Sequence, residues 1–440
     1  MANGIIIAAP SSGSGKTVVT LSILAALRQS GVHVASAKVG PDYIDPCFHS
    51  ESSGQPCLNL DQWAMRPQTI AQNLENLACH SDTVIIEGVM GLFDGPELGK
   101  GSTADLAASL NLPVILVVNC SHQAQSIAAL VKGFAELRSD INLAGVILNW
   151  VSSPRHTRLL KQAVEAIGIK VIGAMPRLDD LQLPSRHLGL VQANEHPEIK
   201  AFINRAGQIA TANIDLISLV ALATPLPAPV PDTPQNNSLP LPPLGQRIAI
   251  ARDEAFGFFY PHFANNWRQA GAEILPFSPL ADEAPAKDAD AIFLPGGYPE
   301  LQAGKLSANT NFLNSLQTTK ALVYGECGGY MVLGDGLIDK AGNRHAMAGL
   351  LPVTTSFANR KLTLGYRTIT HTGALPWPTR LKAHEFHFST IDNEEHPSQP
   401  QAEPLFEACD TTGTPIGPMG LRRGNIMGSY AHIIDAASPS

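Results

Sequence analysis

Short runs of apolar residues alternate along the chain with stretches that carry apolar residues at helical spacing. The first run, residues 4–10, leads into a loop, and residues 17–31 then show the spacing of a helix. Further β-branched runs, each separated from the next by a helical stretch, lie at 32–39, 83–89, 113–119 and 143–151. Continuous apolar strands that alternate with helices predict a parallel sheet covered on both faces. The first half of the chain is therefore predicted to be an α/β domain.

A proline-rich segment interrupts this pattern, which then restarts. Residues 224–246 hold eight of the 34 prolines and a single charged side chain, Asp232. Proline removes backbone donors and favours extended geometry, so the segment is predicted to be a semi-rigid linker, with a long loop inside one domain as the alternative. Strand-like runs return at 247–253, 291–297 and 321–326. We expect two α/β domains, 1–223 and 247–440, joined by 224–246.

Composition and charge narrow the class of protein. A content of 44% hydrophobic and 15% charged residues excludes disorder over most of the 440 residues. The net charge of −8 argues against nucleic acid or an anionic membrane as a partner. No apolar run approaches the ~18 residues of a membrane span, and the first residues lack the basic region of a signal peptide. The six cysteines are scattered without a CxxC pair, which is typical of reduced cytoplasmic thiols. We therefore expect a cytoplasmic protein.

The loop between the first strand and the first helix reads APSSGSGKT, residues 9–17. Its glycines allow several backbone N–H groups to point at one anion, and the helix that follows adds its positive end. The lysine would reach the phosphates and the threonine hydroxyl would bind magnesium. The residues predicted to bind the nucleotide are Gly13, Ser14, Gly15, Lys16 and Thr17. The loop departs from the full P-loop motif at Pro10, which takes the position of its first glycine.

Acidic residues that could hold the magnesium of ATP follow two of the predicted strands. Asp42 lies in KVGPDYIDP and Glu87 in VIIEGVMGLFDG, with Asp45 and Asp94 in the same loops. Carboxylates beside glycines at strand ends suit Mg²⁺, which prefers oxygen ligands. Each residue alone could instead cap a helix or form a turn. Together, at one edge of a parallel sheet, they predict a metal site.

A second chemical motif lies in YGECGGYMVLG, residues 324–334, between a predicted strand and a helical run. Glycines on both sides of Cys327 allow the sharp turn of a nucleophile elbow, and the helix after it is expected to lower the pKa of the thiol. A thiolate nucleophile needs a base, and His432 is the candidate. The N–H groups of Gly297 and Gly328 are expected to stabilise an oxyanion. The other five cysteines are predicted to be inert.

His384 and His387, in AHEFHFS, are the rival histidines. The spacing HEFH is one residue short of the zinc-protease motif HExxH, so the two histidines are not four apart on a helix. The alternation of the segment predicts a strand instead. We interpret these histidines as structural or near the site, without a metal.

These motifs together resemble one family over nearly the full chain. A P-loop synthetase half of the dethiobiotin-synthetase type, a linker and a Cys/His amidotransferase half resemble the cobyrinic and hydrogenobyrinic acid a,c-diamide synthases. The resemblance is carried by APSSGSGKT, KVGPDYIDPCFH, NLDQWAMRP, EGVMGLFDG, GVILNWV, DEAFGFFY, LPGGYPE, GECGGYMVLG, HEFHFS and SYAHIID. The letters AMRP look more like the aerobic-pathway enzymes, whose substrate is metal-free hydrogenobyrinic acid and not cobyrinic acid.

The resemblance implies a fold and a reaction. The fold would be a dethiobiotin-synthetase-like parallel-sheet domain followed by a flavodoxin-like class I glutamine amidotransferase domain. Cys327, assisted by His432, would release ammonia from L-glutamine. The synthetase half would use ATP and Mg²⁺ to convert the a- and c-acetate carboxylates of the corrinoid into acyl phosphates, which ammonia displaces. These steps belong to cobalamin biosynthesis, with small molecules as the partners.

The resemblance also implies residue roles in the nucleotide half. Lys16 would stabilise the transferring phosphoryl group, and Asp94 would act near the nucleotide or its metal. The residues implied to hold Mg²⁺ are Thr17, Asp42 and Glu87. Tyr43 and Ile44 fall where the family contacts its tetrapyrrole.

One position departs from triad amidotransferases, which carry a glutamate two residues after the histidine. This chain has Ile434 there, and the corrinoid amidases as a group lack that glutamate. The group that orients His432 therefore stays open, with Glu385 as one candidate. The oligomeric state, a homodimer included, also stays open.

Three rival functions share some of these features. The nearest is a sister amidase, either cobyric acid synthase or nickel-sirohydrochlorin a,c-diamide synthase. A partition-type regulatory ATPase would carry a second lysine near the start of the loop, where this chain has Ser11. A glutamine hydrolase with a degenerate ATP half is disfavoured because Lys16, Thr17, Asp42 and Glu87 are all present.

Overall fold

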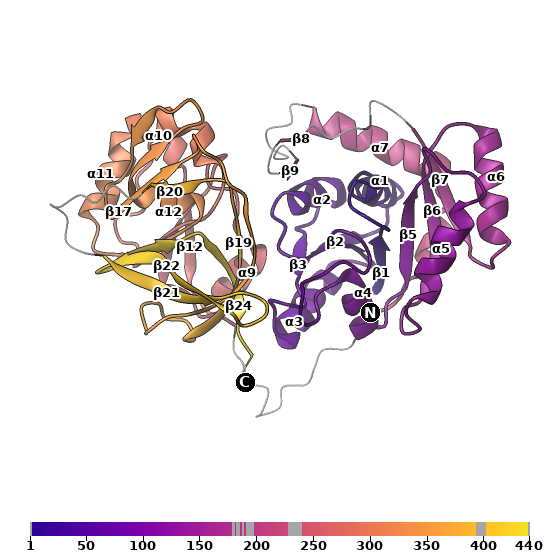
Figure 1. The fold of residues 1–440 in the computed structure, drawn as a ribbon, viewed down its shortest axis with the longest axis horizontal. Helices are drawn as coiled ribbons and strands as arrows, with labels where there is room; N and C mark the ends of the chain where they lie inside the picture. Colours follow the sequence, from indigo (N-terminus) through magenta and orange to yellow (C-terminus); the bar gives the residue numbers. More distant parts are fainter. Residues whose placement is uncertain are drawn as a thin grey trace. The chain divides into compact units, whose positions relative to one another are not determined.

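The computed structural model of the chain describes residues 2–177, 181, 185–186, 189–190, 198–227, 240–392 and 402–438. The chain forms two compact units (Figure 1). Unit 1 comprises Met1–Trp63 and Pro67–Asn236, and unit 2 comprises Ala64–Arg66 and Asn237–Ser440. Three residues in the middle of unit 1 thus belong to unit 2. The central part of the predicted linker, residues 228–239, lies outside the described residues.

Unit 1 is built on a sheet with the strand order β3-β2-β4-β1-β5-β6-β7. Neighbours along this order pair in parallel, and β10 pairs antiparallel with β1. The strands are β1 (Asn3–Ala8), β2 (Val34–Val39), β3 (Leu58–Leu60), β4 (Thr83–Glu87), β5 (Val114–Asn119), β6 (Leu143–Val151), β7 (Val171–Pro176) and β10 (Thr224–Pro225). Strands β1, β2 and β4 bury nearly every side chain, which confirms a sheet covered on both faces.

Helix α1 (Lys16–Gln29) is held on two sides, which fixes the position of its first residues. Val19 and Ile23 pack against sheet residues such as Ile5. Leu21 and Ala25 pack in a second cluster with side chains of α2 and α7. The other helices of unit 1 are α2 (Asp45–Ser53), α3 (Pro67–Ala78), α4 (Thr103–Leu110), α5 (Ile127–Glu136), α6 (Pro154–Glu165), α7 (Ile199–Asn213) and α8 (Leu216–Leu222). A short pair, β8 (Ser185–Arg186) and β9 (Gly189–Leu190), lies apart from the main sheet.

Unit 2 contains a large mixed sheet of order β12-β11-β13-β14-β23-β22-β21-β18-β19-β24. The pairs from β12 to β23 are parallel, and the remaining pairs are antiparallel. The strands are β11 (Arg247–Ala251), β12 (Glu273–Phe277), β13 (Ala291–Leu294), β14 (Leu322–Glu326), β18 (Thr363–Thr370), β19 (Arg380–His387), β21 (Glu403–Cys409), β22 (Pro415–Arg423), β23 (Ile426–Ser429) and β24 (Ala431–Ala436). The parallel part is the flavodoxin-like core, and the antiparallel part extends it.

Smaller elements complete unit 2. A second sheet has the order β16-β15-β17-β20, from β15 (Gly334–Ile338), β16 (Arg344–Ala346), β17 (Leu351–Ser356) and β20 (Thr390–Asp392). The α-helices are α9 (Pro261–Gln269), α10 (Ala303–Ala308), α11 (Thr310–Thr318) and α12 (Gly328–Leu333), and short 3₁₀ turns lie at Pro279–Ala281 and Pro299–Leu301. The apolar core gathers side chains of α10, α11 and α12 on the parallel strands.

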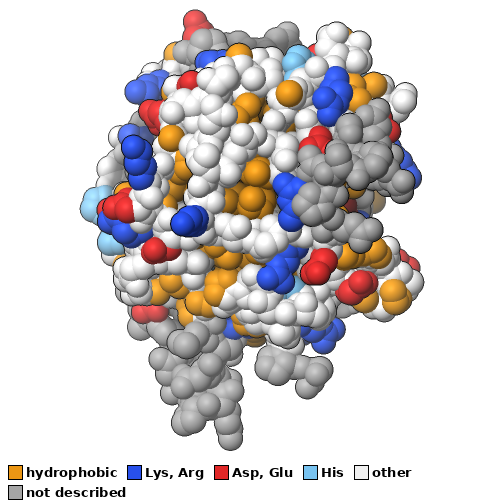
Figure 2. Space-filling view, turned by 90° about the vertical axis from the view of Figure 1, so that its left-hand side faces the viewer, with side chains coloured by type: hydrophobic (Ala, Val, Ile, Leu, Met, Phe, Trp, Pro, Cys, Tyr) orange, Lys and Arg blue, Asp and Glu red, His pale blue; other side chains and the backbone are white. Residues whose placement is uncertain are grey.

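Both ends of the proline-rich segment pack within the units. Thr224–Pro225 form β10, and the carbonyls of Leu241 and Pro242 accept hydrogen bonds from the indoles of Trp267 and Trp377. Among the described helices, none combines the length and apolar character needed to cross a bilayer. On the face drawn in Figure 2, basic and acidic side chains are interspersed.

Candidate active sites

The P-loop of unit 1 connects the end of β1 to the start of α1, as the sequence predicted. Gly13 and Gly15 have φ angles of 77° and 80°, which glycine adopts without strain. The amide of Asn149 donates to the Ser14 carbonyl at 2.9 Å, and a Cβ on Gly15 would lie 2.2 Å from Asn149 Nδ2. The loop therefore needs glycine at position 15 both for its backbone angle and for the close approach of Asn149.

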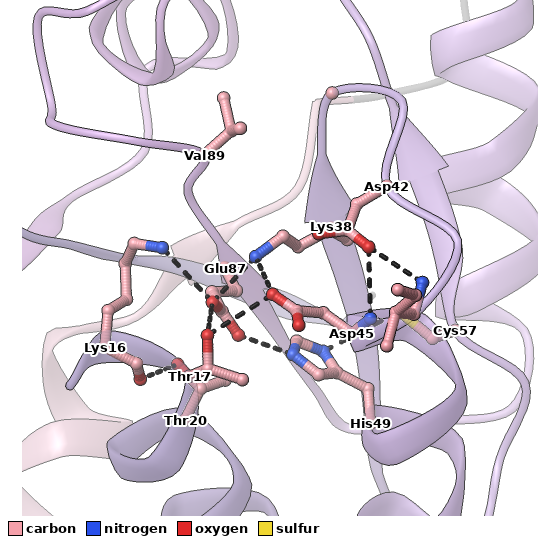
Figure 3. A network of polar contacts seen from close by, with 12 residues as sticks. Lys16, Thr17, Thr20, Lys38, Asp42, Asp45, His49, Cys57, Glu87 and Val89 are labelled. Atoms are coloured by element: carbon pink, nitrogen blue, oxygen red, sulfur yellow. Dashed lines mark hydrogen bonds and ion pairs between the residues drawn. The ribbon is translucent and has the colours of Figure 1, made fainter. Parts of the chain in front are cut away.

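A network of buried charges lies beside this loop and converges on Glu87 (Figure 3). Glu87 ends β4 and is fully buried. Its Oε1 lies 3.2 Å from Lys16 Nζ and 2.8 Å from Lys38 Nζ, and it accepts a 2.7 Å hydrogen bond from the Thr17 hydroxyl. Its Oε2 is 2.5 Å from His49 Nε2. The carboxylate of Glu87 therefore contacts side chains of the P-loop helix, of β2 and of α2.

Asp45 extends the same network. Its Oδ2 lies 2.5 Å from Lys38 Nζ and accepts a 3.3 Å hydrogen bond from the Thr17 hydroxyl. Burial alone would raise the pKa of Glu87, but the charges of Lys38 and Lys16 hold it well below its usual range. Burial, helped by the charge of Lys38, lowers the pKa of Lys16. The site thus holds an ionised carboxylate in the interior of the unit.

Asp42 makes different contacts from Glu87. Its Oδ1 accepts the backbone N–H groups of Ile44 and Asp45, at 2.8 and 3.1 Å, so the side chain shapes the turn before α2. Burial, together with the negative charge of Asp45, raises its pKa to about 6. The turn-forming role given above as the alternative is thus present in the structure. Asp45 is the acidic residue of this loop that contacts Thr17.

The remaining residues predicted for unit 1 lie around the same loops. Asp94 Oδ2 accepts the Gly91 N–H at 2.9 Å, and a Cβ on Gly91 would lie 2.6 Å from both Asp94 Oδ2 and the Pro10 carbonyl. Asp94 is therefore next to the start of the P-loop. Ile44 packs against the apolar cluster of α1 and α2, and Tyr43 is half-buried beside it.

The thiol elbow of unit 2 joins β14 to α12. Cys327 has φ 47° and ψ −103°, a conformation that is rare for a side chain other than glycine. Its N–H donates to the Ser429 carbonyl at 2.8 Å. A Cβ on Gly329 would lie 1.9 Å from the Leu294 carbonyl, so α12 approaches β13 through a glycine. The backbone is thus strained at the predicted nucleophile, as expected of an elbow.

His432 and Cys327 converge on Gly296. His432 is buried in β24, and a Cβ on Gly296 would lie 2.3 Å from His432 Cε1, 3.2 Å from His432 Nε2 and 3.3 Å from Cys327 Cβ. A Cβ on Gly328 would lie 3.1 Å from the Gly297 nitrogen. The structure therefore brings the predicted nucleophile, base and oxyanion donors together.

The expected low pKa of the thiol is wrong. Burial, with the charge of Glu300 adding to it, raises the pKa of Cys327, and only the N–H of Gly328 opposes this shift among the main causes. Helix α12 has six residues, too few for a strong dipole to outweigh the loss of water. Burial also lowers the pKa of His432 to about 3, aided by charges on His384 and His387. Thiol and imidazole are both neutral at rest.

Glu385 binds partners other than His432. Its carboxylate accepts from Arg367 Nε at 2.8 Å and lies 3.0 Å from His387 Nε2.

HEFH is part of strand β19, as its alternation predicted. Within the described ranges, no group of three or more Cys, His, Asp or Glu side chains is arranged to hold a metal ion.

Comparison with known proteins identifies both halves. Residues 5–191 match the family described as CobQ/CobB/MinD/ParA nucleotide binding domain, and residues 247–439 match the CobB/CobQ-like glutamine amidotransferase domain. Proteins named hydrogenobyrinate a,c-diamide synthase are similar over the whole chain. Those of Brucella abortus and Rhizobium meliloti are 52% and 50% identical, and that of Rhodobacter capsulatus is 48% identical; each alignment covers 98% of this chain and 98–99% of the relative.

The chain belongs to the hydrogenobyrinate a,c-diamide synthase family. The resemblance and the fold class predicted from the sequence are thereby confirmed. This membership excludes the purely regulatory partition-type ATPase, since the chain carries a full amidotransferase domain. The nucleotide-binding match also supports ATP as the nucleotide of unit 1.

Two residues of the nucleotide site in unit 1, Lys38 and His49, were not predicted from the sequence. Both contact Glu87 directly. The sequence does give a signal for Lys38: apart from His33, it is the one residue in the apolar run 32–39 that can carry a charge. A lysine inside a buried strand requires an acidic partner. His49 gives no comparable signal, because only the fold brings α2 against β4.

Proposed function

We propose that this chain catalyses the ATP- and glutamine-dependent amidation of the a- and c-acetate carboxylates of hydrogenobyrinic acid, in cobalamin biosynthesis. The main support is the set of relatives named for this reaction, which match 98% of the chain. Their names favour the metal-free substrate over cobyrinic acid. We further propose that the reaction takes place in the cytoplasm, consistent with six free cysteines. A homodimer stays a prediction.

Glutamine hydrolysis is assigned to unit 2. Cys327 Sγ attacks the carboxamide carbon of L-glutamine while His432 takes the thiol proton. The N–H groups of Gly297 and Gly328 stabilise the oxyanion. His432 then returns the proton to the leaving nitrogen, ammonia departs, and water hydrolyses the thioester to glutamate. Direct transfer from thiol to imidazole suits two groups that are both neutral at rest.

Carboxylate activation is assigned to unit 1. Gly13, Ser14 and Gly15 supply the loop around the phosphates, and Lys16 stabilises the phosphoryl group during transfer. A substrate carboxylate oxygen attacks the γ-phosphorus and ADP leaves. Ammonia then attacks the acyl carbon and inorganic phosphate leaves, because phosphate is a far better leaving group than oxide. Tyr43 and Ile44, at the start of α2, are proposed to contact the corrinoid.

The residues beside Glu87 fit a magnesium ion. The Thr17 hydroxyl and the carboxylates of Glu87 and Asp45 are oxygen donors within one hydrogen-bonded group, and these are the donors that Mg²⁺ prefers. We propose Thr17 and Glu87 as ligands, with Asp42 and Asp94 nearby. Bound with ATP, the ion would neutralise phosphate charge.

The test is a mass assay of the purified protein with glutamine, Mg²⁺ and ATP. Hydrogenobyrinic acid, cobyrinic acid and nickel-sirohydrochlorin are offered in turn, and two OH-to-NH₂ replacements are expected on the first. Activity on none of them contradicts the proposal. Preference for cobyrinic acid would make the cobalt-containing corrinoid the substrate, and preference for nickel-sirohydrochlorin favours a sister amidase.

Two variants separate the two half-reactions. Cys327→Ala should abolish amidation from glutamine and retain it with ammonium chloride. Lys16→Ala should lose product with either nitrogen source, since carboxylate activation precedes the use of ammonia. Normal amidation by Lys16→Ala would refute the ATP-site assignment.

A further inference from the structure

The position that holds the orienting glutamate in triad amidotransferases is apolar here. Ile434, two residues after His432, is a buried side chain of β24 that cannot accept a proton or a hydrogen bond. A histidine base works best when a second group fixes which ring nitrogen carries the hydrogen. A substitute must therefore reach the His432 Nδ1 from another element.

Glu326 meets this requirement by its place in the fold. It is the last residue of β14 and directly precedes Cys327. Its side chain is 2% exposed. Its Oε1 accepts the N–H of Ile433 at 3.1 Å, and its Oε2 lies 3.8 Å from His432 Nδ1. The backbone bond anchors the carboxyl group to the strand that carries the histidine.

The two nitrogens of the His432 ring face two different partners. Nδ1 lies on the side of Glu326, whereas Nε2 lies toward Gly296, next to Cys327. The Cys327 N–H bond to Ser429 holds the end of β14 close to the start of β24. Both partners of the imidazole are thus consecutive residues of one strongly constrained turn.

Glu385 is a second buried glutamate near this site, and its carboxylate binds other partners. Arg367 and His387 hold its two oxygens at 2.8 and 3.0 Å. In the β19–β24 pairing it is opposite Ala431, while His384 is opposite His432. Its side-chain contacts therefore support β18 and β19, and His432 is not among them.

We propose that Glu326 is the positioning residue of the glutaminase base, accepting the Nδ1 hydrogen of His432 and so leaving Nε2 to receive the thiol proton of Cys327. This inference rests on the glutaminase role given to unit 2 above. When the thiol proton moves to Nε2, the ring becomes an imidazolium and the carboxylate beside it stabilises the new charge. A 3.8 Å approach is an ion-pair distance that shortens as this charge forms.

The surroundings of Glu326 give a pH signature. Burial raises its pKa to about 8, opposed by the Ile433 N–H and by Tyr324 on the same strand. Other titratable groups also surround this pair. His384 and His387 act on His432, and Tyr324 acts on Glu326. The pKa of the adjacent Cys327 is raised by burial and by the charges of Glu300, Glu326 and Glu385. The glutaminase kcat/KM should therefore increase as pH rises through about 8 and Glu326 ionises.

The experiment compares Glu326→Gln, Glu326→Asp and the exposed control Glu407→Gln in the full chain. In Glu326→Gln the amide presents a donor to Nδ1 and favours the wrong tautomer, so kcat with glutamine should fall about 10²- to 10⁴-fold. The KM for glutamine and the ammonia-dependent rate should stay near wild type. Glu326→Asp retains a carboxylate and should give an intermediate rate, and Glu407→Gln should match wild type. The pH increase near 8 should be absent in Glu326→Gln.

Two outcomes overturn the inference. A wild-type kcat with glutamine in Glu326→Gln would remove Glu326 from the reaction. Parallel loss of glutamine- and ammonia-dependent synthesis in both variants would assign it a purely structural role. Cys327→Ala, measured alongside, tests the proposed function separately: if that variant still uses glutamine, the glutaminase assignment fails whatever Glu326 does.

Discussion

Replacing Lys38 by methionine should strongly destabilise unit 1. Lys38 is buried in β2, with Nζ 2.5 Å from Asp45 Oδ2 and 2.8 Å from Glu87 Oε1. Methionine keeps most of the length of the side chain and removes its charge. Two carboxylates would then remain in the interior with one cation fewer between them. The protein must either bury uncompensated charge or take up protons.

The size of the effect follows from this burial. Removing one partner of a buried ion pair typically costs about 3–5 kcal/mol, against about 5–15 kcal/mol for the whole stability of a domain. Lys16 and His49 remain on Glu87, which places the expected loss at the lower end, about 3 kcal/mol. For a unit of this size that corresponds to a decrease of about 6–12 °C in Tm.

Calorimetry of the full chain without metal measures this decrease. Adding nucleotide identifies which transition belongs to unit 1, because nucleotide binding raises the Tm of the unit that binds it. Lys161→Met, which removes an exposed pair with Glu165 on α6, is the control and should change the Tm little. Adding Asp45→Asn to Lys38→Met should recover part of the loss. A Lys38→Met protein with the Tm of wild type, or no recovery in the double variant, would refute the electrostatic reasoning.

Two further predictions concern unit 1. Gly15→Ala should raise the KM for ATP about 10-fold or more in the ammonia-dependent assay, because alanine is strained at φ 80° by about 1–2 kcal/mol and its Cβ collides with Asn149. The control is Gly31→Ala, which has an equally left-handed backbone but no atom near its Cβ and should leave that KM unchanged. An equal change in both variants would contradict the steric argument. Burial would raise the pKa of Asp105, but bonds from Arg138 and Ser102 lower it to about 2, so its contribution to stability is present above the unfolded value near 3.8 and is lost as pH falls toward 2. The difference in urea midpoint between wild type and Asp105→Asn should therefore be constant above about pH 5 and shrink below about pH 4, and a difference that grows on acidification would show that the sign is wrong.

Local motifs were readable from the sequence because their chemistry depends on consecutive residues. The P-loop needs only a strand, its glycines and a helix start, and the elbow around Cys327 needs only flanking glycines. Both are found where the pattern predicted them. The parallel strands were equally readable, because burial on both faces leaves continuous apolar runs.

The contacts that tune these motifs were not readable, because they depend on strand order. Lys38 meets Glu87 because β2 pairs with β4, 49 residues away. Glu326, at the end of β14, meets Ile433 of β24 across 107 residues, although these two strands do not pair. The thiol pKa was mispredicted for a related reason: a flanking helix is visible in a sequence, whereas the depth of burial of Cys327 is set by the whole core. The antiparallel strands β18, β21 and β22 are partly exposed and give weaker apolar runs.

Because the three residues Ala64–Arg66 belong to unit 2, the glutaminase unit is formed by two separate segments of the sequence. Arg66 forms a bidentate ion pair with Asp435, at 2.7 Å for its shortest contact, and its backbone N–H also donates to this carboxylate. Asp435 is three residues beyond His432 on the same strand. A fragment cut at residues 247–439, the range of the amidotransferase match, would lack this arginine while keeping the buried carboxylate. Isolated expression of that half should therefore require a neutral substitute such as Asp435→Asn. A working glutaminase includes residues that the sequence places inside the synthetase half.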